Sequence, residues 1–406
     1  YYWRVDEVNA APDNAIYKGD VWSFTAEPMA YPIEQVIATS NAITMEGGVP
    51  EHIVDGSGLN ADGQHSTQAD DMWLGAPGDD PVWVQFEFDR IYKLHELRVW
   101  NYNVMFEPVL GFGLKDVTID YSTDGIDWVS LGEAEFARAT ARADYASNTS
   151  VDLGGVPARF VRLNVSSGWG QMGQYGLSEV QFLYIPVQAR EPEPADGATE
   201  VPPDSTLAWR GGREALSHAI YFGTDPETLS LGGTAEQASF APPAMEFGTT
   251  YYWRVDEVND FAEPAFWTGD LWSFSTQEVA LIDGFETYND DLEAGTTIFD
   301  TWLDGWVNDT GSVVGYIDSP FAERRIVRTG AQSMPLHYDN SASPFYSETE
   351  RVFDTAQDWT TYGADSLIVY IQGVAPSEDG TDSGNAPEPL YLVVEDSAGN
   401  TAMAAN

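Results

Sequence analysis

The chain has 406 residues, with 65 acidic and 18 basic side chains and no cysteine. Its formal net charge of −47 disfavours nucleic acid and anionic membranes as partners, and the lack of cysteine excludes disulfides and thiolate metal sites. No run of 18 apolar residues is present, so we expect no transmembrane span. The acidic surface is interpreted either as an adaptation to salt or as suited to oxygen-ligated calcium.

The nine residues YYWRVDEVN occur twice, beginning at Tyr1 and at Tyr251. Residues 1–25 and 251–275 are identical at 15 of 25 positions, which marks a repeated unit of construction. Because the second copy closes a complete small domain, we interpret residues 1–27 as the C-terminal hairpin of a truncated module. A lone hairpin is marginal in water, so we expect upstream residues, a neighbouring chain or the next domain to complete it.

Alternation of apolar and polar residues dominates residues 31–185. Short alternating stretches bounded by Gly, Asp and Asn are typical of half-buried strands. Strands are therefore predicted at Val82–Phe88, Leu94–Trp100, Asp116–Ser122, Arg159–Val165 and Glu179–Ile185.

Five stretches of this segment form a recognisable order: His52–Leu74, Pro81–Asn103, Val117–Gly132, Ala158–Gly170 and Gly176–Ile185. With these stretches, residues 31–185 resemble the F5/8 type C (discoidin) domain, whose fold is shared with family 32 carbohydrate-binding modules. The resemblance implies a jelly roll of two antiparallel sheets, in which loops at one end bind the ligand. Asp124, Gly125 and Trp128 then belong to a structural hairpin.

The resemblance also implies a structural calcium ion beneath those loops. The implied side-chain ligands are Asp55, Ser66, Thr67 and Glu179, together with backbone carbonyls near His52 and Asn60. Calcium takes about six to eight oxygen ligands, which a loop of this length can supply. The alternative is that the two carboxylates only cap turns.

Sugar recognition needs an aromatic face against the C–H side of a pyranose ring and a few fixed polar groups. The loops of this segment that could supply them contain Trp73, Asn101, Tyr102, Asn103, Glu107, Trp169, Gln171, Gln174 and Tyr175. Each aromatic side chain could instead cover the end of the core.

The stretch Pro186–Asp204 is rich in Pro and Glu and is interpreted as a stiff, extended linker that leads into a new domain at residues 187–276. Strands are expected there at Thr206–Arg210, Ser217–Asp225, Thr249–Asn259 and Asp270–Thr276. The stretch Met245–Val255 resembles the corner and sixth strand of a fibronectin type III-like sandwich. That resemblance places Tyr251, Trp253, Val255 and Trp209 in the core, although these aromatics could alternatively form a sugar platform.

Residues 279–406 contain alternating stretches at Leu367–Gly373 and Leu390–Asp396, which predict two strands. The segment resembles lectin-like jelly-roll domains, and we expect it to be incomplete. In such domains Asp283 and Glu286 would be calcium ligands.

The sequence contains no HExxH pair, no GxSxG elbow, no P-loop and no dinucleotide fingerprint. We therefore predict an all-β chain of tandem antiparallel β-sandwich domains that is not an enzyme. The predicted function is a secreted or cell-surface, calcium-stabilised adhesion protein that binds a polysaccharide or cell-surface glycan. The alternative is a structural cell-surface, matrix or filament protein whose stacked sandwiches self-assemble. The order of modules resembles large secreted proteins of planctomycete-type bacteria.

Overall fold

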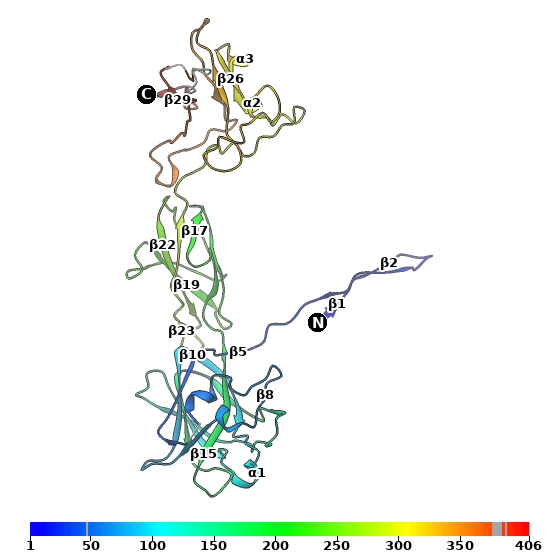
Figure 1. Cartoon of the computed structure of the whole chain (residues 1–406), viewed down its shortest axis with the longest axis vertical. Helices are drawn as coiled ribbons and strands as arrows, with labels where there is room; N and C mark the ends of the chain where they lie inside the picture. The colour runs from blue at the N-terminus through cyan, green and yellow to red at the C-terminus, as the bar shows by residue number, and fades with distance from the viewer. Residues whose placement is uncertain (46–47, 376–383, 386–387, 406) are drawn as a thin grey trace.

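The computed structural model of the chain describes residues 1–45, 48–375, 384–385 and 388–405. The fold is almost entirely antiparallel β, as predicted. Four parts follow one another: an N-terminal hairpin (residues 1–24), a first sandwich (31–185), a second sandwich (187–276) and a C-terminal region (279–406) (Figure 1). Within the described residues, no helix has the length and apolar character needed to cross a membrane.

The N-terminal hairpin projects away from the rest of the molecule (Figure 1). It consists of two short antiparallel pairs, β1 (Tyr2–Trp3) with β4 (Trp22–Ser23) and β2 (Asp6–Val8) with β3 (Ile16–Lys18). Its large apolar side chains are exposed to solvent.

The first sandwich is built on a nine-stranded antiparallel sheet that closes over one core. Two long strands, β10 (Trp83–Asn101) and β14 (Thr149–Val165), pair with each other. Their pairing register shifts between Glu87 and Tyr92 of β10. The other strands are β5 (Tyr31–Pro32), β6 (Val36–Ser40), β7 (Ile43–Thr44), β9 (Trp73–Ala76), β11 (Asp116–Ser122), β12 (Val129–Glu135) and β15 (Tyr175–Ile185). All five predicted stretches form strands, but Val82–Phe88 and Leu94–Trp100 belong to the single continuous strand β10.

Shorter elements complete the first sandwich. The strands β8 (Gln64–His65) and β13 (Tyr145–Ala146) pair with each other, and the helices are η1 (Pro50–Ile53), η2 (Ala69–Asp71) and α1 (Glu107–Leu110). The alternating pattern buries every second residue over Val84–Phe88 of β10, because successive side chains of a strand point to opposite faces. Phe86 and Phe88, for example, are buried and pack on Phe182 of β15 with ring centroids 5.0 and 5.1 Å apart.

The second sandwich packs a three-stranded sheet on a six-stranded one. The first sheet contains β16 (Arg190–Glu193), β18 (Leu207–Arg210) and β21 (Ser239–Phe240). The second contains β17 (Ala198–Val201), β19 (Ser217–Gly223), β20 (Ser230–Ala235), β22 (Thr250–Val258), β23 (Phe266–Trp267) and β24 (Trp272–Thr276). The predicted core residues Trp209, Tyr251, Trp253 and Val255 are all buried, so they form no sugar platform. The Tyr251 hydroxyl accepts a hydrogen bond from the Glu246 backbone N–H at 2.9 Å.

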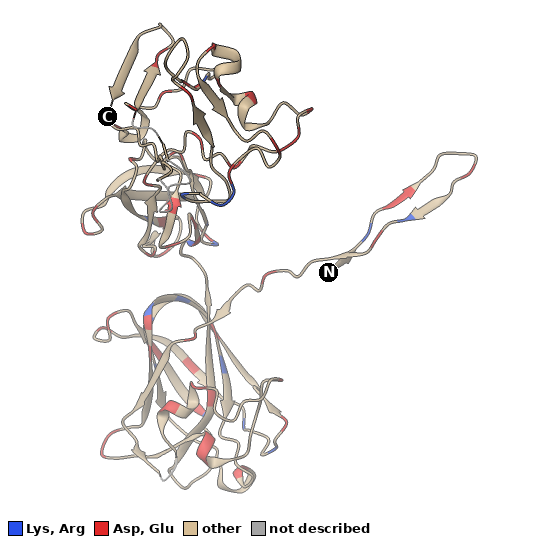
Figure 2. Ribbon diagram, turned by 45° about the horizontal axis from the view of Figure 1, so that its top comes forward, with Lys and Arg blue, Asp and Glu red and all other residues tan. Residues whose placement is uncertain are grey.

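Ion pairs join the two sandwiches. Arg90 lies 2.9 Å from Asp270, and Lys93 pairs with Glu214. Glu27, in the segment that leads into the first sandwich, contacts three arginines of the second: Arg190, Arg210 and Arg213. Figure 2 shows acidic residues along the whole chain and basic segments on both sides of this junction.

The C-terminal region has three two-stranded antiparallel pairs in its described residues. They are β25 (Trp302–Leu303) with β28 (Glu350–Arg351), β26 (Ser312–Val314) with β27 (Leu336–Tyr338), and β29 (Tyr391–Glu395) with β30 (Thr401–Ala405). Three short helices accompany them, namely α2 (Ile298–Thr301), α3 (Gly305–Asn308) and η3 (Thr361–Gly363). The jelly roll expected here stays a prediction.

The two strands predicted in the C-terminal region differ in outcome. The stretch Leu390–Asp396 contains β29 and is confirmed. The prediction at Leu367–Gly373 is wrong, because this stretch is irregular and its side chains, including Tyr370, are exposed. A strand needs a neighbour for its backbone hydrogen bonds, and no described strand pairs with this stretch.

Candidate functional site

The loops at the end of the first sandwich that lies away from the second sandwich meet one another closely (Figure 1). The Gly170 N–H donates to the Gly111 carbonyl at 2.7 Å, and the Lys115 N–H donates to the Ser167 carbonyl at 2.9 Å. Gly111 has a φ of 69°, and a Cβ there would meet the Gly170 backbone at 2.4 Å. Only glycine therefore permits this approach of the α1 segment to the loop at 166–174.

The turn at Asn101–Asn103 lies beneath these loops rather than on their surface. Asn101 and Asn103 are fully buried, and their amide groups bond to backbone groups of three loops. Asn101 donates to the Leu114 and Ala137 carbonyls, and Asn103 donates to the Ser66 and Arg142 carbonyls. The prediction that these asparagines bind sugar is wrong, since their polar atoms already satisfy buried backbone groups.

Three other candidate residues are also buried. Trp73 on β9 is 0% exposed and faces the main core, and Tyr102 is 3% exposed and packs near Phe112. The Glu107 carboxylate accepts the Phe112 and Gly113 N–H groups at 2.9 and 3.0 Å, and burial raises its pKa. None of the three contacts solvent enough to bind a glycan, so their assignment to the sugar site is corrected to a structural one.

The loop at 166–174 and the start of β15 present the remaining candidates. Trp169 is partly exposed, and its indole N–H donates to the Phe136 carbonyl at 3.1 Å. The ring of Tyr175, also partly exposed, packs against Gly168. Gln171 is exposed and Gln174 partly so, and within the described residues neither amide group has a protein partner. An oriented aromatic ring and two free amides therefore share one short loop.

Lys115 is a feature of this loop end that the sequence analysis missed. Its Nζ lies 5.5 Å from the centroid of the Trp169 ring, within the range of a cation–π contact. The only signal in the sequence was a rare lysine immediately before a predicted strand. It places a cation, which also lies 3.7 Å from the Asp116 carboxylate, over the ring of the tryptophan.

Asp55 and Glu179, the two predicted calcium-binding carboxylates, lie close together. Glu179 on β15 is 5% exposed, and burial together with the charge of Asp55 raises its pKa to about 8. Its Oε2 atom has no hydrogen-bond partner among the described residues. An unpaired buried carboxylate oxygen beside a second carboxylate is costly, and a bound cation removes that cost.

Ser66 and Thr67 lie in the loop that packs on Asp55's own loop, since the Ser66 N–H donates to the Gly58 carbonyl at 2.8 Å. The Ser66 hydroxyl donates to Asp71 at 2.5 Å, so its interaction is with that carboxylate. Three or more acidic, histidine or cysteine side chains do not converge anywhere in the described part of the chain. Carbonyl and hydroxyl oxygens would therefore have to complete a calcium shell, and the hard oxygen donors here fit that ion.

In the C-terminal region, the carboxylates of the predicted ligands Asp283 and Glu286 accept hydrogen bonds from other protein groups. Asp283 accepts hydrogen bonds from Tyr288, Trp302 and Arg351 and forms an ion pair with the last of them. One oxygen of Glu286 accepts the backbone N–H groups of residues 331 and 332. Protein donors thus already occupy both oxygens of Asp283 and one oxygen of Glu286, and the metal site here stays a prediction.

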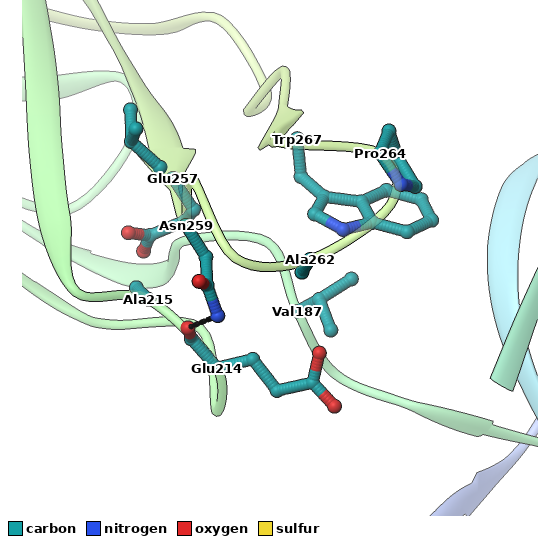
Figure 3. Close-up of a pocket in the computed structure, with 9 residues that line it drawn as sticks. Val187, Glu214, Ala215, Glu257, Asn259, Ala262, Pro264 and Trp267 are labelled. Atoms are coloured by element: carbon teal, nitrogen blue, oxygen red, sulfur yellow. Dashed lines mark hydrogen bonds between the residues drawn. The ribbon is translucent and has the colours of Figure 1, made fainter.

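Two small cavities lie away from the loop end. One, in the second sandwich, has a volume of about 10 Å³ and is lined by Val187, Asn259 and Trp267 among others (Figure 3). The other, of about 50 Å³, lies at the junction near Arg90 and Tyr92. Small-molecule pockets measure about 300–1,000 Å³, so neither cavity encloses a sugar.

The comparisons with known proteins define the first sandwich. Residues 35–180 match the family model of the F5/8 type C domain, so this part of the chain is an F5/8 type C domain. No curated protein matches the chain.

Several solved structures are similar to the chain. One is a family 32 module of a family 31 glycoside hydrolase from Clostridium perfringens, at 15% identity and a TM-score of 0.29, over 38% of this chain and 95% of that one. Another is the family 32 module of C. perfringens NanJ in complex with galactose, at 12% identity and a TM-score of 0.29, over 38% and 98%. A third is the C. perfringens family 89 glycoside hydrolase in complex with PUGNAc, at 15% identity and a TM-score of 0.27, over 38% of this chain and only 14% of that one.

Proposed function

We propose that the chain is a non-catalytic, secreted or cell-surface protein that binds carbohydrate through the loop end of its F5/8 type C domain. The observation that carries this proposal is the position of Trp169, partly exposed and fixed by its hydrogen bond to Phe136. A ring held in one orientation loses little conformational freedom when a sugar stacks on it.

The neighbouring groups supply the polar half of such a site. The free amides of Gln171 and Gln174 can donate to and accept from sugar hydroxyls. Tyr175 offers a second aromatic surface, and Lys115 adds a positive charge at the ring. Trp169, Gln171 and Gln174 are exposed or partly exposed on one short loop, which suits contact with one face of a polysaccharide chain or of a cell-surface glycan.

Calcium has a supporting role in this proposal. Asp55 and Glu179 would hold the ion, and the charge of the ion would favour the ionised form of Glu179. Because β15 contains both Glu179 and Tyr175, calcium would fix the strand from which the binding loop departs.

The test is retention of the full chain on a panel of algal, plant and galactose-containing glycans, in calcium and then in chelator. We expect Trp169→Ala to weaken retention about fivefold, since an aromatic contact contributes about 1 kcal/mol. Trp306→Ala, at an exposed tryptophan of the C-terminal region, is the matched control and should leave retention unchanged. Equal retention of both variants and the wild type would contradict the proposal.

A structural role is the second candidate function. The observation that favours it is the exposed apolar surface of the N-terminal hairpin, which includes Tyr1, Trp3 and Phe24. In that case the chain would self-associate into larger assemblies. Sedimentation of the full chain over a range of concentrations distinguishes the two, because a simple binding protein stays monomeric.

A further inference from the structure

The N-terminal hairpin has the same strand register as a hairpin of the second sandwich. Tyr2 lies opposite Ser23 and Trp3 opposite Trp22, while in the second sandwich Tyr252 lies opposite Ser273 and Trp253 opposite Trp272. All of these pairs are related by the repeat offset of 250 residues. The two segments thus share backbone pairing as well as sequence.

A close backbone approach is repeated too. A Cβ at Gly19 would meet the Val5 carbonyl oxygen at 2.2 Å, and a Cβ at Gly269 would meet the Val255 carbonyl oxygen at 2.1 Å. Gly19 and Gly269 also donate their N–H groups to the equivalent carboxylates, Asp6 and Asp256. The hairpin therefore adopts its folded shape without the strands that surround its counterpart.

The two copies differ sharply in burial. The inward-facing side chains of the second copy are Tyr251, Trp253, Val255, Trp272 and Phe274, and none is more than 7% exposed. Their equivalents in the hairpin, Tyr1, Trp3, Val5, Trp22 and Phe24, are all between 48% and 75% exposed. The same apolar face that forms a core in one copy is open to water in the other.

In the second copy, the equivalent apolar face packs against side chains from the preceding part of the second sandwich. These include Val201, Leu207, Trp209, Ile220 and Met245, all from before Tyr251. The second copy also has one polar feature: Glu257, 2% exposed, pairs with His218 and accepts the Gly212 N–H at 2.8 Å. Glu7 is the equivalent of Glu257 and is exposed.

We infer that the apolar face of the N-terminal hairpin is a docking surface for a half-sandwich of the type formed by residues 187–250. Docking covers Trp3, Val5 and Phe24 with the side chains of that segment. It also brings a histidine to Glu7, because a carboxylate that becomes buried needs a partner of this kind. The repeat thus specifies both the apolar and the polar chemistry of the occupant.

The test adds the occupant to the full chain. Residues 187–250 are fused before Tyr1, so that Thr250 precedes Tyr1 as it precedes Tyr251 in the native sequence. We expect amide exchange in the hairpin to slow at least about tenfold, toward the rates of residues 251–275, as protected strands require. Unchanged exchange in the hairpin would overturn the inference.

Two variants of the fused chain test the details. Glu7→Gln should reduce the new protection, because the fused histidine loses its charged partner. Val21→Ser is the control and should not, since Val21 and its equivalent Leu271 are both exposed. Equal effects of the two substitutions would overturn the assignment of Glu7.

A second copy of the chain is the competing occupant. Sedimentation of the unfused protein decides this point: a monomer supports the inference. A dimer that Trp3→Asp abolishes would overturn it in favour of pairing between two hairpins.

Discussion

In chelator, the free energy of unfolding of the F5/8 type C domain should fall as pH rises, because of Glu179. Burial and the neighbouring Asp55 raise the pKa of Glu179 from 4.5 to about 8. Between these two pKa values the carboxyl group has lost its proton in the unfolded chain but keeps it in the folded domain. Each rise of one pH unit in this range therefore lowers the free energy of unfolding by about 1.4 kcal/mol. The free energy of unfolding in chelator should therefore fall by about 3 kcal/mol between pH 5 and pH 7 from this group alone.

Glu179→Gln isolates that contribution, since glutamine resembles the protonated side chain but does not titrate. Wild type and variant should have similar stability in chelator at pH 5 and diverge as pH rises, with the variant more stable. In calcium the order should reverse, because only the wild type keeps the ligand. Glu133→Gln, at an exposed carboxylate on β12, is the matched control and should behave as the wild type.

Scanning calorimetry of the full chain at several pH values measures the transition of this domain. Calcium titrations in buffers of different ionisation enthalpy then count protons, and near one proton should be released per ion bound below pH 7. A difference between wild type and Glu179→Gln that does not change with pH would refute the reasoning. Calcium stabilisation that survives in the variant would refute it equally.

Three further substitutions have effects that follow from burial. Trp73→Ala should destabilise the F5/8 type C domain by about 3–5 kcal/mol, measured by denaturant titration, because it empties a fully buried core position. Asp283→Asn should cost about 3 kcal/mol in the C-terminal region, since Arg351 loses its partner; an equal loss in chelator and in calcium would confirm that no metal is involved. Arg90→Ala should cost at most about 1 kcal/mol, with less effect in high salt, because its pair with Asp270 is partly exposed; calorimetry at two salt concentrations checks this.

The strands of the F5/8 type C domain could be predicted because each is buried on one face. A strand that is buried on one face alternates apolar and polar residues along the sequence. Asp116–Ser122 shows this alternation, and its predicted bounds match those of β11. The stretch Leu367–Gly373 has the same pattern but remains irregular. Local alternation shows that a segment can form a strand, whereas the presence of a pairing neighbour depends on the rest of the fold.

The loop end was harder to predict than the sheet. Asn101 and Asn103 are polar residues in a turn, which in the sequence alone resembles an exposed binding motif. Their role depends on carbonyl groups as distant in sequence as Ser66 and Arg142, and no local pattern encodes that. Trp169 differed from Trp73 by its flanking glycines, and this signal correctly indicated a loop.

The course of β15 has a mechanical consequence. The strand begins at Tyr175, beside the loop at 166–174, and ends at Ile185, where the chain passes directly into the second sandwich. If a glycan is held at that loop, as proposed, a pull on it would be transmitted to the next module through the covalent backbone of β15. Because β15 is hydrogen-bonded to β5, β9 and β10, the sheet would share that tension with the strand, and the domain would act as a tether.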